Sequence, residues 1–279
     1  MRQLLLICTD LDRTLLPNGE APESVGARQT FAELVSRPQI RLAYVSGRHL
    51  ALVEQAVQDY GLPEPDWIIG DVGSSIYVRQ PHGWSPLEAW SAYVAEDWQG
   101  FGWSDLASCL AGLSALTLQP ENRQNAHKLS YFIPLDADLQ TLTRTIHRRL
   151  EERAIACSLV HSIDEGAAIG LLDILPQRAG KLQAVEFLMH EQGFPHERTI
   201  FAGDSGNDLS VLSSAVPAVL VANAHPDVAA QAMADSARRD TRDRLYLATG
   251  GFLGMNGNYS AGILEGIDHF HAGVVRELA

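Results

Sequence analysis

Cysteine is scarce in this sequence of 279 residues, which contains only Cys8, Cys109 and Cys157. The three are odd in number, lie far apart and form no CxxC or other metal-binding spacing. We therefore expect no disulfides and a reducing compartment.

Positive charge is also low. The chain has 21 lysines and arginines against 34 aspartates and glutamates, which gives a net charge of −13. This balance argues against nucleic acid or an anionic membrane as a partner. An anionic substrate would need local positive charge or a metal ion in order to bind against this field.

Long hydrophobic runs are absent from the sequence. No stretch approaches the ~20 apolar residues of a membrane span. The apolar run before Asp10, of about six residues, is too short for the core of a signal peptide. We therefore expect a cytoplasmic protein.

Short apolar runs that end in polar, glycine-containing turns recur in the first and last thirds of the chain. They predict strands at 4–7, 40–45, 67–69, 199–202 and 219–222, with helical segments between them. Strands that alternate with helices in this way indicate a parallel sheet and an α/β fold.

The middle of the chain has a different character. Four of the five tryptophans (Trp84, Trp90, Trp98 and Trp103) fall within twenty residues of one another. Strand-like runs at 129–133, 155–160 and 170–175 surround an amphipathic helix that carries Leu139, Leu142, Ile146 and Leu150. We therefore divide the chain into a core at 1–80 and 177–279 and an inserted α/β domain at 81–176, whose tryptophans we expect to be packing residues.

Polar residues of complementary kinds follow the predicted strands of the core. Asp10 and Asp12 end the first strand, Ser46 and Gly47 the second, and Asp204, Asn207 and Asp208 a later one, while Lys181 opens a helix. Ligands of open α/β sheets bind outside the carboxyl ends of the strands. Four such groups in order make a functional site more probable than four unrelated turns.

These residue types are the ones that phosphoryl transfer requires. Asp10 is the expected nucleophile and Asp12 the expected general acid and base. Asp10, Asp204 and Asp208 offer hard oxygen ligands for Mg²⁺, and we count the neighbouring Asp12 with them. Further residues are expected to hold or orient the phosphate, the lysine as a point charge: Ser46, Gly47, Lys181 and Asn207.

At these residues the chain resembles the haloacid dehalogenase (HAD) superfamily of aspartate-nucleophile phosphatases. Asp10 to Thr14 matches the DxDxT motif, Ser46 the hydroxyl of the second motif, Lys181 the third, and Gly203 to Asp208 the GDSGND form of the fourth. The resemblance implies a Rossmann-like core, bound Mg²⁺ and a cap domain between the second and third motifs. Segment 81–176 lies in that place.

The chain is more closely similar to the sucrose-6-phosphate phosphatases of this superfamily. Three tracts carry this likeness: 124–131, 172–181 and 259–270. It implies sucrose 6-phosphate as substrate and a cap that contacts the sugar, with Gln124, His127 and Lys128 as candidates. The cap tract departs from the family pattern at Ala126, where proline is common.

Other functions stay open at this point. A mannosylfructose-phosphate phosphatase would share these motifs, and a phosphosugar mutase would share the aspartyl-phosphate. A phospho-accepting receiver groups similar residues around Mg²⁺ but lacks an acid/base at Asp12 and a large insertion. An association with a sucrose-phosphate synthase, with or without catalysis, is also left open, and we expect a monomer.

Overall fold

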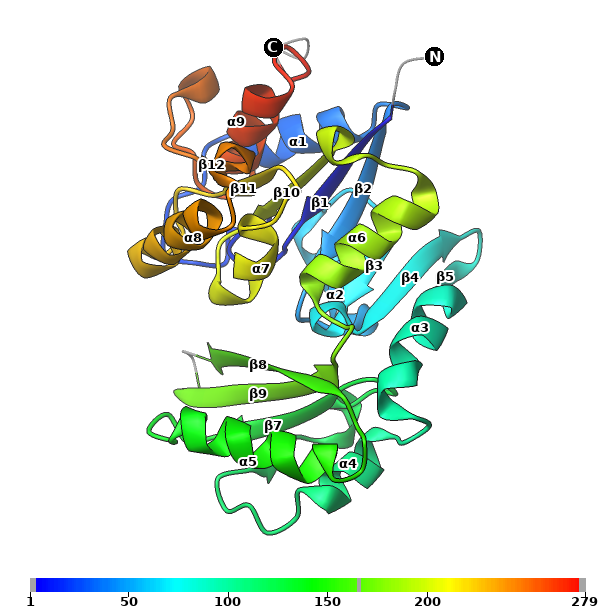
Figure 1. Ribbon diagram of the computed structural model, residues 1–279. Coiled ribbons are helices and arrows are strands. Elements are labelled where there is room, and N and C mark those ends of the chain that lie inside the picture. The colour runs from blue at the N-terminus through cyan, green and yellow to red at the C-terminus, as the bar shows by residue number, and fades with distance from the viewer. Residues whose placement is uncertain (1–3, 165–166, 276–279) are drawn as a thin grey trace.

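Two β-sheets organise the protein in the computed structural model, which describes residues 4–164 and 167–275. One sheet has eight strands in the order β12-β11-β10-β1-β2-β3-β4-β5, and the other has four in the order β6-β7-β9-β8. The two sheets form separate bodies that face each other (Figure 1).

The eight-stranded sheet is parallel except at one edge. Its parallel strands are β1 (Leu5–Thr9), β2 (Ile40–Val45), β3 (Trp67–Gly70), β10 (Thr199–Gly203), β11 (Ala218–Leu220) and β12 (Leu245–Leu247). The antiparallel edge is the hairpin of β4 (Ser75–Gln80) and β5 (Gly83–Pro86). The predicted α/β fold with a parallel sheet is thus confirmed.

Helices cover both faces of this sheet. One face packs against α1 (Ala27–Val35), α2 (Leu50–Tyr60) and α9 (Ser260–Phe270), and the other against α6 (Lys181–Gln192), α7 (Leu209–Leu212) and α8 (Pro226–Arg238). The central strand β1 is continuously apolar because its side chains pack into the hydrophobic clusters on both faces of the sheet. Leu6 and Cys8 enter one hydrophobic cluster, and Leu5 and Ile7 enter the other, since successive side chains of a strand point to opposite faces.

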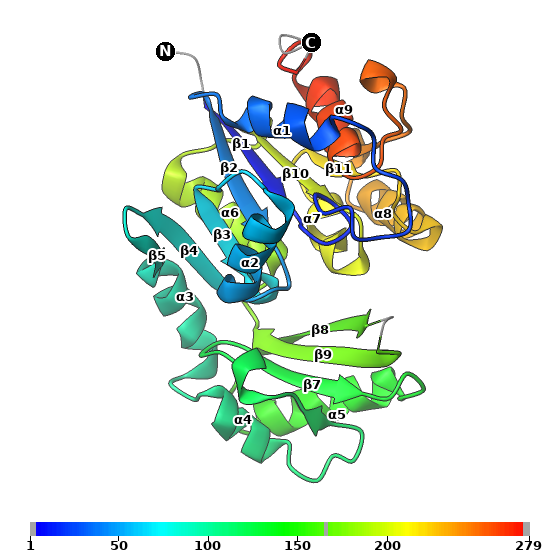
Figure 2. The same ribbon diagram turned by 180° about the vertical axis from the view of Figure 1, so that it is seen from behind.

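The four-stranded sheet is antiparallel and consists of β6 (Thr117–Leu118), β7 (Leu129–Ile133), β8 (Cys157–Asp164) and β9 (Ile169–Pro176). Helices α4 (Trp103–Cys109) and α5 (Leu139–Glu151) lie on the side away from the large sheet (Figure 2). Leu142, Ile146 and Leu150 of α5 are buried as predicted, whereas Leu139 is exposed.

The predicted start of the insertion, residue 81, falls inside the β4–β5 hairpin of the large sheet. Helix α3 (Glu88–Trp98) follows and bridges the two bodies, because Trp90 packs in the cluster of the large sheet and Trp98 in that of the small one. We therefore propose that the insertion begins after Pro86. The outer segments 1–80 and 177–279 also include 1–3 and 276–279, which lie outside the described residues, as do 165–166.

Cys8, Cys109 and Cys157 are free in the structure. Within residues 4–164 and 167–275 there is no helix with both the length and the apolar character needed to cross a lipid bilayer.

Candidate active site

The ends of three adjacent parallel strands bring the predicted site residues together. Asp10 follows β1, Ser46 follows β2 and Asp204 follows β10, and these strands are neighbours in the sheet. Their carboxyl ends meet at the edge that faces the small sheet (Figure 1). The sequence predicted this gathering from strand ends alone.

Lys181 reaches this edge from the first residue of α6 and is buried between two carboxylates. Its Nζ donates to Asp10 Oδ1 at 2.8 Å and to Asp208 Oδ1 at 2.7 Å. The residue is only 2% exposed, so it is not a solvated lysine at a helix start. Burial by itself would lower the pKa of Lys181, but Asp10 and Asp208 outweigh burial and raise it, so the ammonium stays charged.

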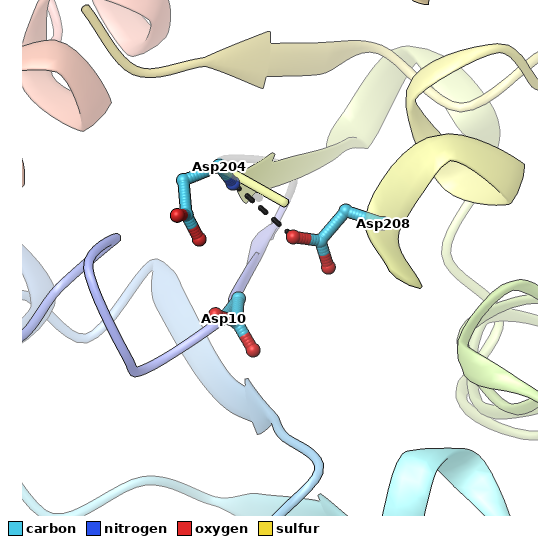
Figure 3. A group of neighbouring side chains, drawn as sticks. All are labelled: Asp10, Asp204 and Asp208. Carbon is cyan, nitrogen blue, oxygen red and sulfur yellow. Dashed lines mark hydrogen bonds between the residues drawn. The ribbon is translucent and has the colours of Figure 1, made fainter. Parts of the chain in front are cut away.

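Three buried aspartates form a compact group of oxygen atoms. Asp10, Asp204 and Asp208 each offer a carboxylate oxygen, and these atoms lie within 4.8 Å of one another. Figure 3 shows the three side chains converging, with Asp208 accepting a hydrogen bond from the Asp204 backbone N–H at 3.1 Å. Gly203 permits this turn, because a Cβ there would lie 2.6 Å from the Asp208 carboxyl carbon.

The charge of this group is incompletely balanced by protein residues. Of its three carboxylates, those of Asp10 and Asp208 contact the single ammonium of Lys181. Burial, and then repulsion by Asp208, raise the pKa of Asp204 to about 7. Burial likewise raises the pKa of Asp10 well above its usual range, although Lys181 opposes the effect. A divalent cation that accepts hard oxygen ligands fits such a set, because it would supply the missing positive charge.

Cation binding at this group should depend on pH, because protons compete for the same oxygens. With a pKa of about 7 in the metal-free protein, Asp204 is protonated below that pH and ionised above it. We expect the affinity for Mg²⁺ in calorimetric titrations to be roughly tenfold weaker at about pH 6 than at about pH 8. An affinity that stays constant over this range would contradict a cation site at Asp204.

Asp12 lies apart from this group, with a cation of its own. Arg48 donates to the Asp12 carboxylate through Nε at 2.8 Å and Nη2 at 2.6 Å, and Asn18 Nδ2 donates to it at 2.7 Å. Burial alone would raise the pKa of Asp12, but Arg48 and Asn18 outweigh it and lower the pKa. The structure does not bring the Asp12 side chain to Asp10, Asp204 and Asp208, so we do not propose its carboxylate as a metal ligand.

The other predicted phosphate contacts occupy the same edge. Ser46 is buried and its Oγ accepts a hydrogen bond from the Arg48 backbone N–H at 3.1 Å. Gly47 is exposed beside it. Asn207 Oδ1 accepts from Ser205 Oγ at 3.1 Å. Asn207 therefore orders the loop that carries Asp208, and its role toward a phosphate stays a prediction.

The three candidate sugar contacts from the inserted domain, Gln124, His127 and Lys128, have different partners in the structure. Gln124 is engaged with its own loop, since its Nε2 donates to the Gln119 and Ser130 carbonyls and its Oε1 accepts from the Ser130 N–H. The His127 ring stands edge-on to Trp98, with the ring centroids 6.4 Å apart. Lys128 points toward the large sheet, where its Nζ lies 2.8 Å from Asp71 Oδ1.

Sequence reasoning assigned no role to three residues that complete the site. Arg48 grips Asp12, Thr14 Oγ1 donates to Asp204 Oδ1 at 3.0 Å, and Asp71 pairs with Lys128. Asp71 directly follows β3. The signal that singled out Asp10, Ser46 and Asp204, a polar residue after a buried parallel strand, could therefore have found it.

Comparison with known proteins identifies the family. Residues 3–271 match the family described as sucrose-6F-phosphate phosphohydrolase. A protein of Nitrosococcus oceani described only as a HAD-like hydrolase is 50% identical over 273 residues, which cover 97% of this chain and 72% of that protein. The mannosylfructose-phosphate phosphatase of Agrobacterium fabrum is 29% identical over 97% of this chain and 98% of its own length.

A solved structure agrees with these relatives. The sucrose-phosphatase of Synechocystis sp. PCC6803, in complex with sucrose and phosphate, superposes with a TM-score of 0.73 at 27% identity, covering 96% of this chain and 98% of that one. The chain spans only 60% and 51% of the length of the two tobacco sucrose-phosphatases that it matches. This chain belongs to the sucrose-6F-phosphate phosphohydrolase family, a family of sugar-phosphate phosphatases with the HAD fold.

Proposed function

We propose that the chain is a Mg²⁺-dependent phosphatase that hydrolyses a disaccharide phosphate, with sucrose 6-phosphate as the first candidate, through an aspartyl-phosphate on Asp10. The observation that carries this proposal is that two aspartates of one motif bind different cations and lie in different surroundings. Asp10 is bound by Lys181 next to two further carboxylates, whereas Asp12 is held separately by Arg48 and is 42% exposed.

The first proposed step forms the bond between an Asp10 oxygen and phosphorus and breaks the bond between phosphorus and the sugar oxygen. Asp12 gives a proton to that leaving oxygen, which requires that Asp12 be protonated in the substrate complex and released from the Arg48 contact that lowers its pKa in the free protein. In the second step water attacks the phosphorus of the aspartyl-phosphate, and Asp12, now ionised, takes a proton from the water. Asp10 is released as a carboxylate and inorganic phosphate leaves.

Charge on the transferring group is the main cost of this chemistry. Lys181 supplies a fixed positive charge, and Ser46 supplies a hydroxyl at the same edge. Asp10, Asp204 and Asp208 would hold Mg²⁺, which supplies further positive charge for the phosphoryl oxygens when it is bound. The net charge of −13 makes these local cations necessary for an anionic substrate.

Asp12→Asn tests the acid/base role through the leaving group. Because a sugar alkoxide needs a proton and p-nitrophenolate does not, we expect kcat to fall by about 10²–10⁴-fold with sucrose 6-phosphate. With p-nitrophenyl phosphate the first step should be affected much less, as measured by the burst of p-nitrophenol. An equal loss of the first step with both substrates would contradict a proton-donor role for Asp12.

The substrate assignment depends on the family and on the inserted domain that faces the site. A domain that closes over the phosphate site can contact the leaving group and exclude water. Lys128 points from this domain toward the large sheet, and we propose it as a sugar contact. A mannosylfructose phosphate is the alternative, since a phosphatase of that substrate is similar over nearly the whole chain.

Release of free phosphate with Mg²⁺ tests the proposal, with sucrose 6-phosphate, mannosylfructose phosphate and simple hexose phosphates as substrates and EDTA as control. A preference of ~100-fold for sucrose 6-phosphate, about 2.7 kcal/mol in the transition state, is the expected result. Equal and slow hydrolysis of all of them would overturn the substrate assignment. Conversion of substrate without phosphate release would instead favour a mutase.

A further inference from the structure

The chain contains only two lysines, Lys128 and Lys181, and its other basic residues apart from histidine are arginines. Both lysines are buried, with 5% and 2% exposure, and both pair with aspartates. Lys181 belongs to the phosphate site described above. Lys128 comes from the inserted domain, and its partner Asp71 comes from the large sheet.

The Lys128–Asp71 pair is buried on both sides. The side chains are 7% and 4% exposed, and Lys128 Nζ lies 2.8 Å from Asp71 Oδ1. Beside it, Asn125 Nδ2 donates to Ser74 Oγ at 3.2 Å. The two bodies of the protein are therefore joined at this point by a buried charge pair with a neighbouring hydrogen bond, and not by a solvated surface ion pair.

Asp71 is fixed by the loops of the phosphate site. Its N–H donates to the Arg48 carbonyl at 2.9 Å, and the next N–H, of Val72, donates to the Ser46 carbonyl at 3.1 Å. Asp71 and Val72 have φ of 51° and 60°, which non-glycine residues seldom adopt. Backbone in such a conformation persists only where its surroundings determine it, and it is common at functional sites.

The same loop also touches the start of α6. A Cβ on Gly73, whose φ is 93°, would lie 2.3 Å from the Gly180 carbonyl carbon and 2.7 Å from the Lys181 backbone nitrogen. Residues 71–73 thus contact the segments that carry Ser46, Arg48 and Lys181. The position of Asp71 is tied to the position of the phosphate-binding residues.

On the side of the inserted domain, Lys128 lies among further polar groups. The half-buried Asp173 carboxylate accepts a short hydrogen bond from Ser130 Oγ at 2.5 Å and experiences the charges of both Lys128 and Asp71. An ammonium has three N–H donors, and one of those on Lys128 is directed to Asp71. An ammonium held in this way can donate to a substrate hydroxyl without loss of the ion pair.

We propose that Asp71 is a positioning residue that determines sugar specificity by fixing Lys128 at a set place relative to the phosphate site. This inference rests on the proposed function, because Lys128 is taken to contact the sugar. Without the Asp71 carboxylate, the Lys128 ammonium would lose the ion pair that holds it beside the large sheet, and it would shift relative to the sugar part of the substrate. The phosphate part would bind as before, because residues 71 and 72 contact the loops of Arg48 and Ser46 through backbone N–H groups, which Asp71→Asn keeps.

A double-mutant cycle of Asp71→Asn and Lys128→Gln tests the proposal. With sucrose 6-phosphate we expect each single variant to raise KM by about 10- to 100-fold, and the double variant to be no worse than either, because the two residues act as one unit. With p-nitrophenyl phosphate, which has no sugar, kcat/KM should stay within about threefold of wild type. Asp71→Glu should restore part of the lost affinity, and the exposed Asp59→Asn is the matched control.

Because the chain has only two lysines, chemical labelling of lysine gives a readout that does not depend on activity. Labelling of Lys128 by an amine-reactive reagent, followed by peptide mass spectrometry, should be faster in Asp71→Asn than in wild type, while that of Lys181 should be unchanged. Additive effects on KM, or an equal loss with p-nitrophenyl phosphate, would overturn the positioning role. Failure of the wild type to hydrolyse any sugar phosphate would refute the proposed function and this inference together, and is seen before any variant is made.

Discussion

Asp10→Asn is expected to abolish turnover while the protein stays folded. Asparagine has nearly the shape of aspartate but cannot form the aspartyl-phosphate, so kcat should fall by on the order of 10⁴- to 10⁶-fold in phosphate-release assays. The fold should tolerate the change because Lys181 keeps its bond to Asp208 at 2.7 Å. Removing one of three neighbouring carboxylates also relieves repulsion among them.

Two controls make this result interpretable. Asp59→Asn alters an exposed aspartate on α2 and should retain wild-type activity. Thermal unfolding without metal should place Asp10→Asn at or above the melting temperature of wild type. Activity near the wild-type level in Asp10→Asn would refute the assignment of the nucleophile.

Lys181→Met should have the largest effect on stability. The ammonium is 2% exposed and its loss leaves Asp10 and Asp208 buried without the cation that each contacts. Breaking a buried pair by removing one partner typically costs about 3–5 kcal/mol in the free energy of unfolding. We expect a loss of this size in urea unfolding, together with loss of activity.

Mg²⁺ should offset part of this destabilisation, because the freed carboxylates are candidate ligands for the cation. The comparison variant is Arg148→Met on the exposed face of α5, which should change the unfolding free energy by no more than about 0.5 kcal/mol. If Lys181→Met were as stable as wild type without Mg²⁺, the conclusion that Lys181 stabilises the fold by neutralising Asp10 and Asp208 would be wrong.

The core of the site could be predicted from sequence because three of its four motifs follow a buried parallel strand, whereas Lys181 begins helix α6. Leu5 to Cys8 is apolar on both faces of β1 and thereby identifies a strand whose end must lie at the binding edge. The two neighbouring strands deliver Ser46 and Asp204 to the same edge. Connections of a parallel sheet leave little freedom in where such ends meet.

Other features depend on tertiary contacts that spacing does not encode. Asp10 and Asp12 would point to the same side of an extended strand, but β1 ends at Thr9 and the chain turns at Leu11, between the two aspartates. The two carboxylates therefore separate, one toward Lys181 and the other toward Arg48. No local pattern reveals which cation each will meet.

The start of the inserted domain, which we propose to lie after Pro86 and not at residue 81, also depends on tertiary contacts. The tryptophan-rich character begins near residue 80, yet Trp84 and Trp90 pack against the clusters of the large sheet. The amino-acid composition changes near residue 80, whereas the hydrogen bonds between β4 and β5 place residues 75–86 in the large sheet.

Chemical trapping of the intermediate tests the central claim most directly. Borohydride added during turnover of sucrose 6-phosphate with Mg²⁺ reduces an aspartyl-phosphate to homoserine, which peptide mass spectrometry can locate. We predict homoserine at position 10 and at no other aspartate, dependent on substrate and absent with EDTA. Turnover of sucrose 6-phosphate without modification of Asp10, or with modification at another aspartate, would contradict the account.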